Sequence, residues 1–207
     1  MSTDIEKSFT ATLKYDINRD KAGRSDLIST DFSYIDKSDR DGGTLWSTNS
    51  NPTLQNVDHQ FLCINTKARD AVTLYFRYDS KNGGYRIWIR SGSQKGMILA
   101  RTNPGYIYAN KNYDRPHLWR LVQREIGGEW TPTTEFDYNK SELLMQVLKG
   151  STWTNIGLYA KKIPDSSEPN LWWSYIETGN QDPHWWLADI KYGVDYEPSD
   201  VWGAGKA

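Results

Sequence analysis

The sequence Arg115-Pro116-His117-Leu118-Trp119-Arg120-Leu121 decides how this chain is interpreted, because two similar segments occur elsewhere in it. In each copy a turn-forming Asp or Pro precedes a histidine, and Phe or Trp follows two residues after the histidine. The other copies are Asp58-His59-Gln60-Phe61-Leu62-Cys63-Ile64 and Asp182-Pro183-His184-Trp185-Trp186-Leu187-Ala188. Recurring segments of this kind are the signature of a repeat architecture. We therefore expect three similar units.

Strand patterns fill the sequence around these copies. Tyr85-Arg86-Ile87-Trp88-Ile89-Arg90 alternates most cleanly, with Tyr85, Ile87 and Ile89 on one face. Clusters of Gly, Pro, Asp, Asn and Ser separate such segments, at 39–43, 80–84, 103–105 and 165–170. Helical patterns are weak, and the best candidate, 141–149, is short and runs into Gly150. Many short strands predict an all-β barrel or sandwich.

Matching positions group the strands into three four-stranded repeats, at approximately 28–65, 80–123 and 141–192, in one domain spanning 1–207. Each histidine-headed segment is expected to form the fourth strand of its unit. Since strand side chains alternate, Phe61, Trp119 and Trp186 are expected to point into one shared interior. The segment 10–17 lies outside the repeats and is expected to pair with 72–78. The tail, 193–207, is expected to close the barrel near this first strand or to wrap over the surface.

Three four-stranded units, each ending in an aromatic two residues after a polar residue, resemble the β-trefoil family. The resemblance is greatest to ricin-B-type lectin domains, whose units end in Gln-x-Trp, where this chain has His-Gln-Phe, His-Leu-Trp and His-Trp-Trp. It covers roughly 28–192. It implies a β-trefoil fold and a non-catalytic lectin that binds glycans or glycoproteins, with a role in defence.

In ricin-type units the third strand supplies a ring that stacks on the sugar, and an Asn follows it. By this resemblance the ligand-binding residues are Tyr106, Tyr108, Asn110 and Asn112 in the second unit, and Trp172, Trp173, Tyr175 and Asn180 in the third. For each ring, packing in the core or in a loop is the alternative. Ricin-type sites also use an Asp at the end of the second strand. The matching stretches hold Ser47, Arg101 and Lys161, which argues against a galactose-type site.

Composition excludes several classes of protein. The 25 Lys and Arg residues nearly balance 26 Asp and Glu residues, giving a net charge of −1, which argues against a nucleic-acid partner. The aromatic content, with 10 Trp and 13 Tyr, argues against disorder. The single cysteine, Cys63, excludes an internal disulfide and is expected in the core. The sequence contains neither a signal-peptide pattern nor a transmembrane segment, so we expect a soluble protein, cytoplasmic or secreted without a leader.

Catalytic patterns are missing from the sequence. It contains no nucleophile elbow, no P-loop and no dinucleotide-binding glycine pattern, so we expect no catalytic residues and no cofactor. Three histidines also permit a metal site, but hydrogen bonding to neighbouring turns is the favoured interpretation, and no metal is expected. The alternative function is a toxin component or protease inhibitor acting through the long loops 124–138 and 163–170. The oligomeric state is left open, with a homodimer among the alternatives.

Overall fold

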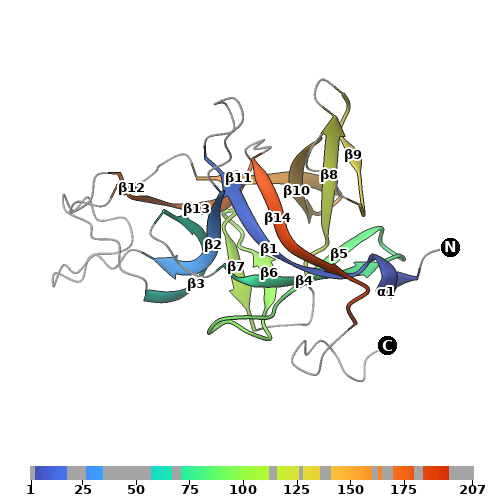
Figure 1. Cartoon of the computed structure of the whole chain (residues 1–207), viewed down its shortest axis with the longest axis horizontal. Helices are drawn as coiled ribbons and strands as arrows, with labels where there is room; N and C mark the ends of the chain where they lie inside the picture. The colour runs from blue at the N-terminus through green and yellow to red at the C-terminus, as the bar shows by residue number, and fades with distance from the viewer. Residues whose placement is uncertain are drawn as a thin grey trace.

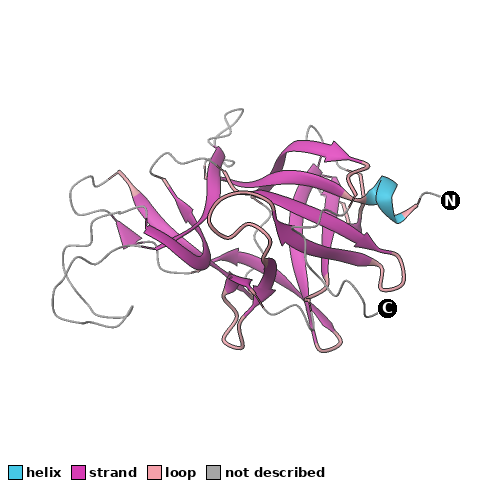
Figure 2. Ribbon diagram, turned by 90° about the horizontal axis from the view of Figure 1, so that it is seen from below, coloured by secondary structure: helices cyan, strands magenta, loops and turns pink. Residues whose placement is uncertain are grey.

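The computed structural model describes residues 3–17, 27–34, 57–66, 71–111, 116–125, 128–135, 141–159, 163–164, 170–179 and 184–195. These residues form a short helix and fourteen strands, which confirms the all-β prediction (Figure 2). The elements are α1 (Asp4–Lys7), β1 (Phe9–Asp16), β2 (Leu27–Tyr34), β3 (Val57–Asn65), β4 (Thr73–Asp79), β5 (Gly84–Ile89), β6 (Ile98–Arg101), β7 (Ile107–Asn110), β8 (Trp119–Glu125), β9 (Thr131–Pro132), β10 (Ser141–Lys149), β11 (Thr152–Leu158), β12 (Ile163–Pro164), β13 (Trp172–Thr178) and β14 (Trp185–Tyr192).

Six of these strands form a closed ring. Strands β14, β1, β4, β5, β8 and β10 are paired in that order, and β1 and β14 run side by side through the middle of Figure 1. An isolated bridge between Leu143 and His184 joins β10 back to β14. Ring closure reduces the unpaired strand edges that expose open sheets to aggregation. The predicted pairing of 10–17 with 72–78 is confirmed by the register of β1 and β4.

Three hairpins extend from the ring. They are formed by β2 with β3, β6 with β7, and β11 with β13, and in each hairpin the first strand also pairs with a ring strand, β1, β5 or β10. The second strands of the hairpins, β3, β7 and β13, pair with one another. The paired residues are Phe61 with Tyr108, Tyr106 with Glu177, and Tyr175 with Cys63. The three pairings form a cycle. Phe61 lies opposite the residue two positions after Tyr106, Tyr106 lies opposite the residue two positions after Tyr175, and Tyr175 lies opposite the residue two positions after Phe61.

The main core fills the ring. The rings of Phe9 and Phe76 stack with their centroids 4.6 Å apart, and the ring of Tyr85 packs edge-on against Phe9 at 5.5 Å. Tyr85, Ile87 and Ile89 all lie in this core, as their alternation predicts. The strongest helical candidate, 141–149, forms β10, because Leu143, Met145 and Val147 alternate into the same core.

The prediction that Phe61, Trp119 and Trp186 share one interior is wrong in two of its three residues. Trp119 is fully buried in the main core. In the third segment Trp185 takes the buried position, at 1% exposure, while Trp186 is half-buried. The indole N–H of Trp185 donates to the carbonyl oxygen of Ile156 at 3.0 Å. A shift of one residue along a strand moves a side chain to the opposite face. Because the third histidine-headed segment has tryptophan both one and two residues after His184, the pattern selected the wrong tryptophan.

Phe61 is misplaced for a different reason. His117 and His184 precede the ring strands β8 and β14, whereas His59 lies within β3, a hairpin strand. Phe61 accordingly packs in a separate cluster that also contains Cys63 and Tyr175. Where the structure describes the predicted first repeat, 28–65, its strands are the hairpin strands β2 and β3, and the ring strands on either side of it are β1 and β4.

The beginning of the C-terminal tail lies against the start of β1. The backbone N–H of Gly193 donates to the carbonyl oxygen of Ser8 at 2.9 Å, and Val194 packs against Tyr75, Trp88 and Ile98. These contacts agree with the prediction that the tail closes near the first strand. The rest of the tail, 196–207, lies outside the described residues.

Alanine variants of the adjacent residues Trp185 and Trp186 test the register of β14. We expect Trp185→Ala to lower the free energy of unfolding by about 3–5 kcal/mol, because it empties a buried site, whereas Trp186→Ala should lower it by no more than about half as much. Chemical denaturation followed by far-ultraviolet circular dichroism measures both. Equal losses, or a larger loss for Trp186→Ala, would contradict the register of β14.

Candidate functional site

Two of the predicted ligand-binding rings pack against each other where the three hairpins meet. Phe61, Tyr106 and Tyr175 form a hairpin aromatic cluster, in which the three centroid distances are 6.0, 5.6 and 5.5 Å. Tyr175 is 8% exposed and Tyr106 is half-buried. Burial, together with nearby Tyr159 and Glu177, raises the pKa of the Tyr106 phenol. The three rings contact one another in edge-on and tilted arrangements, so they support the hairpins.

The two tryptophan candidates of the third unit lie outside this aromatic cluster. Trp172 is half-buried against the main core, and its backbone N–H donates to the Oγ1 of Thr66 at 2.6 Å. The backbone of Trp173 is paired with Asn65 and Ile163 in β13. The side chain of Trp173, and the whole of Asn112 and Asn180, lie outside the described part of the chain.

Tyr108 and Asn110 come together in an open cavity of about 610 Å³, which we call the Tyr108 cavity. The two residues alternate along β7 and therefore share a face. The remaining lining residues were not predicted, and they are Gln60 from β3, Gln94 and Met97 from the β5–β6 connection, Ala109 from β7, and Lys111, which follows β7. Gln60 reaches the cavity through the pairing of β3 with β7, which no local sequence pattern reveals.

Phe61 and a glycine turn position the Tyr108 cavity. The ring of Phe61 lies 6.3 Å from that of Tyr108, on the paired strand β3. The turn into β7 contains Gly105 at φ +121, whose carbonyl oxygen accepts the backbone N–H of Thr178 at 2.9 Å. A Cβ at this position would come within 2.6 Å of the Thr178 side chain, so only glycine permits this close approach of β7 to β13.

The chemistry of the Tyr108 cavity is that of neutral hydrogen bonding beside a ring. Gln60, Gln94 and Asn110 each carry an amide that offers both donors and an acceptor. Tyr108 adds a phenol and an apolar ring face. Lys111 is exposed and is the charged residue among the lining residues that the structure describes. Such a surface can bind a polyhydroxylated ligand.

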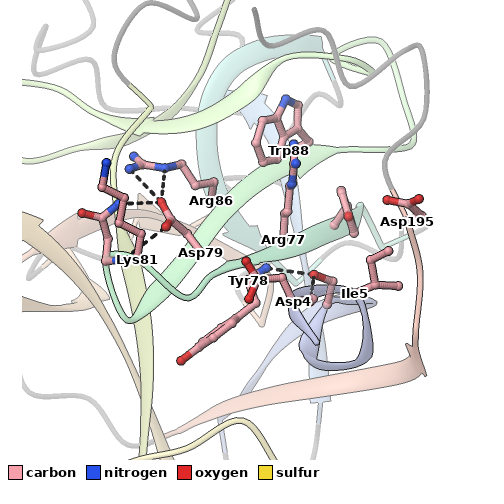
Figure 3. A pocket seen from close by; sticks show the side chains of 12 residues that line it. Asp4, Ile5, Arg77, Tyr78, Asp79, Lys81, Arg86, Trp88 and Asp195 are labelled. Carbon is pink, nitrogen blue, oxygen red and sulfur yellow. Dashed lines mark hydrogen bonds and ion pairs between the residues drawn. The ribbon is translucent and has the colours of Figure 1, made fainter. Parts of the chain in front are cut away.

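A second cavity, of about 450 Å³, lies on the outer face of the β4–β5 ribbon beside α1 (Figure 3). Its lining includes Arg77, Arg86 and Trp88 from the ribbon and Asp4 from α1, none of which the sequence analysis proposed as functional. Arg77 lies directly opposite Arg86 across the two strands. Two like charges directly opposite each other are unfavourable in a sheet. Aligning the two strands in the sequence would reveal this pair and so indicate this site.

The charged groups of this second cavity bind one another and the surrounding backbone. Both Nε and Nη2 of Arg86 donate to the Oδ2 of Asp79, at 3.2 and 3.1 Å, and Nη1 donates to the carbonyl oxygen of Pro116. The Asp4 carboxylate accepts from the hydroxyl of Ser80 at 3.1 Å. These bonds attach α1 and the β4–β5 turn to the ring. We therefore assign the second cavity a structural role and take the Tyr108 cavity as the candidate site.

Two of the three histidines, His117 and His184, have side chains within the described part of the chain. No group of three or more His, Cys, Asp or Glu side chains that could hold a metal ion occurs in that part. Burial, and the nearby charges of Arg101 and Arg86, lower the pKa of His117. Its Nδ1 is buried, with no hydrogen-bond partner among the described residues. The ring of His184 packs against that of Tyr15 at 5.6 Å.

Comparison of the chain with protein-family models, with curated proteins and with solved structures gave no match. Within the described residues, no helix has the length and apolar character needed to cross a membrane.

The depressed pKa of His117 predicts a pH dependence of stability. Its pKa is lower in the folded than in the unfolded state, so the unfolded chain binds the proton first as the pH falls. Stability is therefore fully present above the ordinary histidine pKa of about 6.5 and is lost as the pH falls from there through the folded-state value. We expect His117→Gln to weaken this dependence between pH 7.5 and 5.5, measured by urea denaturation. An unchanged slope would show that other groups cause it.

Proposed function

We propose that this chain is a non-catalytic carbohydrate-binding protein of β-trefoil architecture, similar to ricin-B-type lectin domains, with one glycan site in the Tyr108 cavity. The observation that carries the proposal is the convergence of one tyrosine ring and three amide side chains on a single open cavity. A pyranose presents an apolar face that a ring can cover and hydroxyl groups that amides can bind in pairs.

The strand pairings support the architecture. A β-trefoil consists of a six-stranded ring capped by three hairpins, and both parts have counterparts among the described strands. In this proposal the units are 9–79, 84–125 and 141–192. The cyclic pairing of Phe61, Tyr106 and Tyr175 supports a pseudo-threefold relation between them.

The same pseudo-threefold relation favours one glycan site over several. The position two residues after the cluster ring holds Cys63 in the first unit, Tyr108 in the second and Glu177 in the third. Cys63 is fully buried, and its thiol donates to the carbonyl oxygen of Asp31 at 3.4 Å. Burial raises the pKa of the Glu177 carboxyl. Only the second unit therefore carries a ring at this position.

A glycan array with the wild-type protein and site variants tests the proposal. We expect wild-type protein to bind, and Tyr108→Ala to reduce affinity about tenfold or more, since a lost ring contact of about 1.4 kcal/mol corresponds to that factor. Asn110→Ala should also weaken binding, because it removes one paired hydrogen-bonding group.

The matched control is Tyr192→Ala, which removes an exposed tyrosine on β14, away from the Tyr108 cavity. It should leave glycan binding unchanged, and thermal melting shows whether each variant is folded. A folded wild-type protein that gives no array signal would contradict the proposal. Tight inhibition of a protease panel, unaffected by Tyr108→Ala, would instead favour a toxin or inhibitor acting through the loops.

A further inference from the structure

We propose that the Tyr108 cavity selects acidic saccharides, carrying a carboxylate or sulfate group, and that Lys111 pairs with the anion. This inference rests on the proposed glycan site and names the class of ligand that the site takes. Two properties of the cavity lining support it: an excess of hydrogen-bond donors over acceptors, and a positive charge with no carboxylate among the described lining residues.

Donors outnumber acceptors on the cavity lining. Each of the three amides has two N–H donors and one carbonyl oxygen, and the ammonium group of Lys111 has three donors and no acceptor. No carboxylate lines the cavity within the described chain. Among the described lining side chains, the acceptors for a sugar hydroxyl are the amide and phenol oxygens. A ligand rich in acceptor oxygens matches this lining better than a neutral sugar does.

The position of Lys111 lets it act on the same ligand as the ring. It directly follows Asn110 at the end of β7, it is exposed, and it lines the same cavity as Tyr108. Charge-assisted hydrogen bonds from an ammonium to a carboxylate or sulfate are shorter and stronger than neutral ones. The ring would hold the sugar while Lys111 binds the substituent.

In the second cavity, by contrast, the cation Arg86 is paired with a carboxylate. There Arg86 lies 3.1 Å from the Asp79 carboxylate, and Asp4 and Asp195 also line the cavity. Lys111 has no acidic residue beside it among the described lining of the Tyr108 cavity. Within the described lining, no carboxylate offsets the charge of Lys111, and an uncompensated cation favours an anionic ligand.

The test compares matched pairs of oligosaccharides by isothermal titration calorimetry at low and high salt. One pair is a sulfated oligosaccharide and its desulfated form, and the other is a uronic-acid oligosaccharide and its carboxyl-reduced form. We expect at least one acidic form to bind about fivefold more tightly than its neutral partner at low salt, the size expected of an exposed ion pair. The advantage should shrink as salt rises. The pair that shows it identifies sulfate or carboxylate as the recognised group.

Lys111→Gln should remove this advantage and leave the affinity for the neutral form unchanged. Lys149→Gln, which removes an exposed lysine at the end of β10, is the matched control and should have no effect. Equal affinity for acidic and neutral forms, or equal effects of the two lysine variants, would overturn the inference while leaving the glycan site intact. Absence of binding to either form, in wild type and Tyr108→Ala alike, would overturn the glycan site itself.

Discussion

The mutual packing of Phe61, Tyr106 and Tyr175 determines where the three hairpins lie, and the candidate site is built on one of those hairpins. Each ring contacts the other two, with centroids 5.5 to 6.0 Å apart. Aromatic pairs at such distances contribute about 0.5–1.5 kcal/mol each beyond their burial. Because the contacts form a cycle, removing any one ring breaks two of them. The strand pairings beneath the rings then fix the register of β3, β7 and β13 together.

This shared backbone carries three different side chains at the position next to the cluster. Where the second unit has Tyr108 at the cavity, the first has the buried thiol of Cys63 and the third has Glu177. In the proposed three-unit arrangement the strand pairings recur, but the side chains at this position differ. A function that depends on a ring at this position belongs to one unit, since function resides in a site and not in a fold.

The sequence allowed the strands to be predicted better than their roles. Alternation correctly placed Tyr85, Ile87 and Ile89 in the core, because period-2 burial is a local property. The histidine-headed pattern could not separate a ring strand from a hairpin strand, since both carry an aromatic beside a polar residue. His59 therefore matched His117 although their strands have different partners. Tyr108 and Asn110 could be proposed from their spacing on one strand, whereas Gln60 joins them only through the pairing of β3 with β7, and Gln94 comes from the β5–β6 connection.

The contrast between the two cavities shows why volume alone does not identify a site. On the outer face of β4 and β5, Arg77 lies opposite Arg86, an arrangement that is unfavourable by itself. Asp79 offsets it by accepting two hydrogen bonds from Arg86. A ligand entering there has to compete with bonds that already attach the turn to the ring, and it loses their energy in doing so. At the Tyr108 cavity a ligand meets amides at a surface open to solvent. Binding there exchanges hydrogen bonds with water for hydrogen bonds with a sugar, whereas binding at the second cavity has to compete with the Arg86–Asp79 ion pair.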